Sequence, residues 1–187
     1  MADQFNLILK KFPEKQRRAL LETIERVEIL FPFAERAIAW GMPTLKIGED
    51  NLCHVMGFKN HNSLFPSSGS IASLHTDALK NMVVSKGTIH FDLESAFPKA
   101  LLKKLLLSRL NQINESYPKN NGSFVEYYKN GAIKAIGKYR QKEMHGEWKF
   151  FRLDGSLMRS GRFNAGKQTG LWRTFDKSGR EVKATTF

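Results

Sequence analysis

Glycine recurs with a fixed period towards the end of the sequence, and this period is the strongest constraint on the fold. Two sets of three glycines share a spacing of 24 residues: Gly122, Gly146 and Gly170, and Gly131, Gly155 and Gly179. Aromatic residues keep the same spacing in three columns: Phe124, Trp148 and Trp172; Tyr127, Phe151 and Phe175; Tyr139, Phe163 and Phe187. Self-similarity at a fixed period marks a repeat architecture, so residues 122–187 are expected to form three structural copies.

Each copy reads as a β-hairpin. Asn130-Gly131, Asp154-Gly155 and Ser178-Gly179 are two-residue turn signals, which predict type I′ turns between paired strands. Gly166 is expected in a looser link between copies. Because a single hairpin is marginally stable in water, the rings are expected to hold neighbouring copies together in an antiparallel β-meander.

The repeat also resembles a known family. The pattern G-x-W-x-x-[YF]-x-x-[DN]-G, followed by a hydrophobic strand and G-x-[YF], is similar to the MORN-type variant repeat found in bacterial proteins labelled as antitoxins of the YwqK type. The first copy departs from the pattern, with Phe124 in place of tryptophan. The resemblance implies a binding or spacer module with lipid or protein contacts.

Charge is distributed unevenly along the chain. Residues 119–187 hold 15 basic and 6 acidic residues, a net +9, within a chain of net charge +12. Basic charge interleaved with aromatic rings is typical of nucleic-acid binding, and also of a thin sheet whose outer face is kept soluble. The single cysteine, Cys53, fits a reducing compartment, and the N-terminal residues carry no secretory pattern, so we expect a cytoplasmic protein without a transmembrane segment.

The first part of the chain alternates helical and strand patterns. Apolar spacing predicts a helix over 14–30, a shorter helix over 33–40 and a last helix opened by Pro98. Strands are expected at 44–47, 51–58, 62–65 and 87–92. The expected fold is α+β: a two-layer α/β sandwich with an antiparallel sheet over residues 1–114, a linker over 115–121, and the three 24-residue repeats over 122–187.

This part resembles the YdhG-like domain of unknown function, a family that includes a frataxin-like bacterial iron chaperone. The matching motifs lie near the start, in the middle and near the end of the domain: Glu35, Ile38, Trp40, Gly41 and Pro43; Lys59, His61, Phe65 and Pro66; Lys86, Gly87, Thr88, Ile89, Phe91 and Pro98. The resemblance implies a small sandwich with a concave sheet. Iron as a bound ion is implied by this resemblance alone.

Four motif residues are candidates for ligand binding, because core packing does not account for them. They are polar or amphipathic and lie beside glycine or proline: Trp40, Lys59, His61 and Lys86. Two lysines and a histidine around a tryptophan would suit an anion or a small acidic ligand. The alternative is that the lysines are solvated turn residues, the tryptophan belongs to the core and the histidine caps a strand.

No catalytic or metal-binding pattern stands out. Cys53 and His54 are adjacent, so in a strand they point to opposite faces and do not form a nucleophile–base pair. The histidines and carboxylates show no recognisable metal-ligand spacing, so no resident metal or cofactor is expected.

We therefore expect a non-enzymatic binding or adaptor protein. Its first domain would hold a small-ligand or anion pocket, and its basic, aromatic repeat sheet would contact an unknown protein partner or another macromolecule. The alternatives are an iron chaperone, a nucleic-acid-binding protein and an antitoxin-like protein. The ligand, the partner and the oligomeric state are not encoded in any motif.

Overall fold

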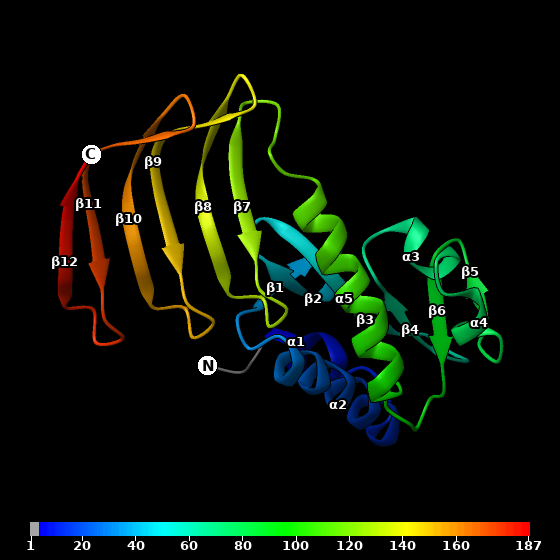
Figure 1. Cartoon of the computed structure of the whole chain (residues 1–187). Helices are drawn as coiled ribbons and strands as arrows, with labels where there is room; N and C mark the ends of the chain where they lie inside the picture. The colour runs from blue at the N-terminus through cyan, green and yellow to red at the C-terminus, as the bar shows by residue number, and fades with distance from the viewer. Residues whose placement is uncertain (1–3) are drawn as a thin grey trace. The chain divides into compact units, whose positions relative to one another are not determined.

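The structure of the protein is a computed structural model, which describes residues 4–187. The chain divides into two compact units between Asn111 and Gln112, and each is described here by itself (Figure 1). The first combines a six-stranded antiparallel sheet with helices, and the second is another six-stranded antiparallel sheet. This mixed α+β architecture confirms the class that the sequence predicts.

Helices α1 (Gln4–Leu9), α2 (Glu14–Leu30), α3 (Gly69–Ser73) and α4 (Thr76–Leu79) belong to the first unit, as do residues 99–111 of α5 (Lys99–Glu115). Helix α2 begins directly after Pro13 and has the predicted bounds, because its apolar side chains recur at helical spacing and become buried. None of the helices in residues 4–187 is long and apolar enough to span a lipid bilayer.

The sheet of the first unit has the strand order β1-β2-β3-β4-β6-β5. Its strands are β1 (Glu35–Ala39), β2 (Met42–Ile47), β3 (Asp50–Gly57), β4 (Asn62–Phe65), β5 (Val84–Ser85) and β6 (Thr88–Phe91). The helix predicted over 33–40 is wrong. That segment forms strand β1 at the sheet edge, where pairing with β2 overrides the helix propensity of its Glu, Arg and Ala residues.

Helix α2 covers one face of this sheet. Gln16 donates its side-chain amide to Asn62 Oδ1 at 3.0 Å and to the carbonyl of Phe58 at 2.9 Å. Asn62 therefore faces α2, and the alternation of strand side chains turns Ser63 and Phe65 to the opposite face. His54 is the register partner of Phe65 and lies on that opposite face as well.

The strands of the second unit follow one another in sequence order: β7 (Ser123–Tyr127), β8 (Ile133–Arg140), β9 (Glu143–Phe151), β10 (Leu157–Asn164), β11 (Lys167–Phe175) and β12 (Glu181–Thr186) (Figure 1). Each 24-residue copy supplies one hairpin, as predicted.

The predicted positions of the type I′ turns are wrong: they lie between the copies and not within them. Within the copies, Gly131, Gly155 and Gly179 have positive φ, but Asn130, Asp154 and Ser178 do not. Each of these glycines instead donates its N–H to the carbonyl three residues earlier, which is the type I turn with a left-handed glycine. The tight turns with positive φ at both residues lie between copies, at Gln141-Lys142 and Ala165-Gly166, so Gly166 is not in a loose link.

Aromatic rings join the copies, which confirms the expectation that they form the core of the repeat. Trp148 and Trp172 are 2% and 1% exposed, and each indole N–H donates to a backbone carbonyl of the preceding strand, that of Lys138 or of Arg162. Each indole also lies over a glycine. A Cβ added to Gly137 or Gly161 would come within 2.2 Å of the ring, so these glycines are required by the tryptophans.

Candidate functional site

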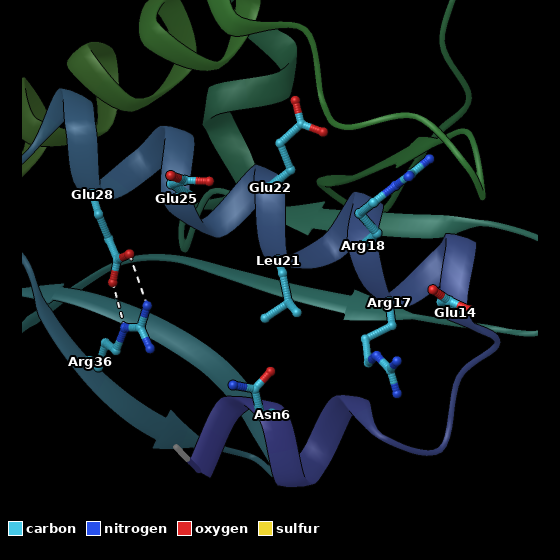
Figure 2. A pocket seen from close by; sticks show the side chains of 9 residues that line it. All are labelled: Asn6, Glu14, Arg17, Arg18, Leu21, Glu22, Glu25, Glu28 and Arg36. Atoms are coloured by element: carbon cyan, nitrogen blue, oxygen red, sulfur yellow. Dashed lines mark hydrogen bonds and ion pairs between the residues drawn. The ribbon is translucent and has the colours of Figure 1, made fainter. Parts of the chain in front are cut away.

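One cavity of about 800 Å³ lies along helix α2. Four glutamates and three arginines line it together with Asn6 and Leu21, and Figure 2 shows Glu28 and Arg36 pointing toward one another. Arg36 Nη2 donates to Glu28 Oε2 at 2.9 Å. Because both signs of charge are present and this prominent pair is already satisfied, we interpret this groove as a solvated helix surface rather than a ligand site.

Two hairpin tips of the first unit carry unusual residues. Trp40-Gly41 joins β1 to β2, and Lys86-Gly87 joins β5 to β6. All four residues have positive φ, from 49° at Lys86 to 79° at Gly87. Such type I′ turns favour Asn, Asp or Gly at the first position, so tryptophan and lysine are held there at a cost in backbone strain.

Both tips line one cavity of about 520 Å³. Its wall also includes His54, Phe65 and Arg109, together with the 66–69 segment. Trp40 packs edge-on against His54, with ring centroids 5.0 Å apart, yet it remains 78% exposed. A tryptophan so exposed at the mouth of a cavity offers a free ring face for stacking.

His54 presents one defined nitrogen to its surroundings. The Thr44 hydroxyl donates its only proton to the carbonyl of Met42 at 2.9 Å, so it accepts from His54 Nδ1 at 2.7 Å. That assignment leaves a lone pair on Nε2. The side chain is 3% exposed, and burial lowers the pKa of His54 to about 4, so the imidazole is neutral at pH 7.

Ser67 and Arg109 add polar groups to the wall of the same cavity. Ser67 is a third non-glycine residue of the wall with positive φ, at 53°, and its buried Oγ has no hydrogen-bond partner. Arg109 donates from Nε to the carbonyl of Asn51 at 3.1 Å, and burial lowers the pKa of its guanidinium while the nearby Asp50 raises it. The cavity therefore combines cationic groups, a hydroxyl and aromatic surface, with Glu49 and Asp50 at its edge.

The structure brings together two of the four predicted site residues. Trp40 and Lys86 share the cavity just described, whereas His61 lines a separate cavity of about 530 Å³ beside His90. The His61 and His90 rings are stacked 3.8 Å apart, and burial together with the charge of His61 lowers the pKa of His90. Lys59 lines neither cavity.

Sequence reasoning did not select His54, Ser67 or Arg109 for this cavity. His54 reaches it through the register of β2, β3 and β4, and Arg109 reaches it from helix α5. The only sequence signal was indirect: tryptophan and lysine each stand immediately before glycine, although the segment that ends at Trp40 was expected to be helical.

Metal ligation and thiol chemistry find little support in the described part of the chain. Residues 4–187 contain no group of three or more His, Cys, Asp or Glu side chains placed to hold an ion. Cys53 is fully buried, and desolvation raises the pKa of its thiol to about 12, so it remains protonated at neutral pH.

One solved structure resembles this architecture. It is the crystal structure of a DUF1801-family protein, YdhG, from Bacillus subtilis, with a TM-score of 0.55 and 15% sequence identity. The alignment covers 96% of that chain and 64% of this one, a share close to the 111 of 187 residues in the first unit. The first unit has a YdhG-like fold. At 15% identity the likeness shows only the fold of this unit and not its function. No protein-family model and no curated protein matches the sequence.

Proposed function

We propose that the YdhG-like unit binds a small molecule that has a flat apolar part and an anionic group, at the cavity between the Trp40 and Lys86 hairpin tips. The observation that carries this proposal is that three non-glycine residues with positive φ, Trp40, Ser67 and Lys86, line one cavity. Strained backbone that is kept at a cavity is a hallmark of ligand sites.

Each group in the cavity has a role in this proposal. The exposed ring of Trp40 stacks on the flat part of the ligand, and Lys86 supplies charge to its anionic group. Neutral His54 accepts a hydrogen bond through Nε2, and the unpartnered Ser67 hydroxyl donates one. The role is binding rather than catalysis, since the Cys53 thiol is protonated and lies outside the cavity wall. The iron alternative lacks a converging set of ligands in residues 4–187.

The second unit contributes to the proposed adaptor role through charge rather than through its tryptophans. Trp148 and Trp172 are buried in the packing between copies, so their ring faces are not available to a partner. Basic side chains such as Lys149 and Lys167 are exposed on the sheet. A macromolecular contact on this unit would therefore be electrostatic and sensitive to salt.

Tryptophan fluorescence tests the ligand site directly. Of the three tryptophans, only Trp40 is exposed, so acrylamide quenching reports on this residue. Benzoate serves as the aromatic anion, and benzamidine, with the same shape and opposite charge, serves as the ligand control. We expect benzoate to protect Trp40 in a saturable manner and benzamidine to protect it much less.

Lysine variants supply the matched control. Lys86→Gln is expected to weaken the protection by benzoate about fivefold or more, because it removes a charge-assisted contact. Lys59→Gln removes the same charge from a residue outside the cavity, and is expected to have less than about a twofold effect. Equal protection by the two ligands, or equal loss in the two variants, would show that the cavity does not select an anion.

A further inference from the structure

A cluster of basic side chains lies at one end of the repeat sheet, in the second unit. Lys119, Lys138, Arg140, Lys142 and His145 line a cavity of about 660 Å³, together with neutral residues of the 118–122 loop and the β8–β9 turn. No carboxylate contributes to this wall. Within residues 4–187, no ion pair involves Lys138, Arg140 or Lys142, so none of these charges has a direct ion-pair partner in the protein.

Hydrogen bonds connect the walls of this cavity. The N–H of Tyr139 donates to the carbonyl of Gly122 at 2.7 Å, which ties the 118–122 loop to strand β8. A side chain at Gly122 is excluded, because an added Cβ would lie 2.1 Å from the Tyr139 oxygen. Lys119 is positioned by a 2.7 Å bond from its Nζ to Ser116 Oγ. The positive charges therefore converge on a shaped site rather than on an open sheet.

The internal repeat supplies a comparison, because the next copy places the equivalent residues 24 positions later. There the turn is Ala165-Gly166, with φ of 46° and 75°, and glycine suits the second position. The first copy has Gln141-Lys142 at 52° and 67°. The fold itself thus accepts a relaxed turn, and the first copy keeps a strained lysine that lines the cavity.

The cationic residues of this cavity also differ from the residues 24 positions later. Lys138 corresponds to Arg162, but Arg140 corresponds to Asn164 and Lys142 to Gly166, so the second copy lacks two of the three cations. The nearest carboxylate in sequence, Glu143, is the register partner of Arg140 but forms no ion pair with it, and it lies near Gly166, where an added Cβ would be 4.0 Å from the Glu143 side chain. The basic cluster is therefore a property of this one turn and not of the repeat.

We propose that this cavity binds adjacent phosphate groups, either of a small polyphosphate or nucleotide, or of a single-stranded nucleic acid. Several unpaired cations with no carboxylate match the charge density of consecutive phosphates, and the amide side chains of Asn120 and Asn121 can donate further hydrogen bonds. The site lies wholly within the second unit and does not depend on the ligand proposed for the YdhG-like unit.

Binding is tested with fluorescein-labelled dodecauridylate by anisotropy, over a series of salt concentrations. The pocket variant is Lys138→Gln, Arg140→Gln and Lys142→Gln together. Its control is Lys129→Gln, Lys177→Gln and Lys183→Gln, which removes the same charge from exposed residues of the same unit that do not line this cavity and are distinct from Lys149 and Lys167. We expect the pocket variant to bind at least roughly tenfold more weakly and its log–log salt slope to fall by about 2, because each lost phosphate contact accounts for ~0.7.

Two further arms complete the test. Pyrophosphate as competitor distinguishes the two kinds of phosphate ligand. If a low concentration of pyrophosphate displaces the labelled oligonucleotide, the site is assigned to small phosphate compounds; if the oligonucleotide stays bound, the site is assigned to a single-stranded nucleic acid. Lys142→Gly copies the relaxed turn of the next copy, so it is expected to weaken binding while the protein stays folded. The proposal is overturned if neither probe binds, or if the pocket and control variants lose affinity equally, since either result would mean that no specific site exists.

Discussion

The close approach of Trp172 to Gly161 gives a sharp test of how the repeat is held together. Gly161→Ala adds a Cβ that would lie 2.2 Å from Trp172 Cδ2. Ordinary van der Waals contact begins at 3.4 Å, so the indole must move by 1.2 Å or more. Trp172 is 1% exposed, and its ring packs against Phe150 and Phe163, so that movement would disturb its packing against both rings.

The size of the effect follows from two losses. Overpacking a dense core costs about 1–3 kcal/mol, and displacement of the indole breaks the 3.2 Å bond from its N–H to the Arg162 carbonyl, worth about 1 kcal/mol. We therefore expect Gly161→Ala to lower the free energy of unfolding of the second unit by about 2–4 kcal/mol. The φ of Gly161 is not in the left-handed region, so backbone strain contributes nothing.

The assay is urea unfolding followed by tryptophan fluorescence in a Trp40→Phe background, where both remaining tryptophans lie in the second unit. Combination with Trp172→Leu completes a double-mutant cycle, and we expect a coupling of at least about 1.5 kcal/mol. Gly179→Ala is the control: its φ is +85° and nothing lies within 4 Å of the added Cβ, so its cost comes from the backbone and should not couple to Trp172. A Gly161→Ala cost below about 0.5 kcal/mol, or an uncoupled cycle, would refute the reasoning.

Three other predictions concern single residues. Lys142→Gly should stabilise the second unit by about 1 kcal/mol, as measured by urea unfolding, because glycine relieves the left-handed conformation; a loss of stability would contradict the strain argument. Burial lowers the pKa of His54 from 6.5 to about 4 in the folded protein, so the buried neutral imidazole leaves the stability of the first unit unaffected above pH 6.5. As the pH falls towards 4, the free energy of unfolding should decrease by up to about 3 kcal/mol, because the unfolded state then binds a proton that the folded state does not. Unfolding can be followed by the circular dichroism of the helices at pH 7.5 and pH 4.5. The difference in unfolding free energy between the two pH values should be smaller in His54→Gln than in the unaltered protein, and an unchanged difference would exclude His54 as its source. Thr23→Val should destabilise the first unit by about 1–3 kcal/mol in the same assay, since the Phe97 N–H would lose its 3.0 Å acceptor Thr23 Oγ1, whereas Lys15→Gln on the exposed side of the same helix should have little effect.

Much of the fold could be predicted because local patterns agree with it. Apolar spacing fixed the bounds of α2, and the 24-residue period fixed the hairpins of the second unit. Strand β1 was missed because an edge strand paired on one side lacks a strong period-2 pattern, and its residues favour a helix. The tight turns were missed because Gln141-Lys142 lacks the Asn or Gly that signals positive φ.

The candidate site was only partly predictable. Trp40 and Lys86 stand beside glycines, which marks them as hairpin tips once the strands are known. Their meeting, however, depends on a sheet register and on a helix side chain, Arg109, that no short-range pattern encodes. His61 was grouped with them because it is polar and close in sequence to proline, but the structure places it beside His90.

The serial arrangement of the second unit has a mechanical consequence. In the ladder of the sheet, each strand from β7 to β12 pairs only with its neighbours in sequence, and each tryptophan holds its own hairpin to the one before. Tension applied to β12 would therefore be resisted by one hairpin at a time. Under such a pull, we expect the sheet to unzip in steps of one repeat length, with a force peak each time an indole leaves its glycine.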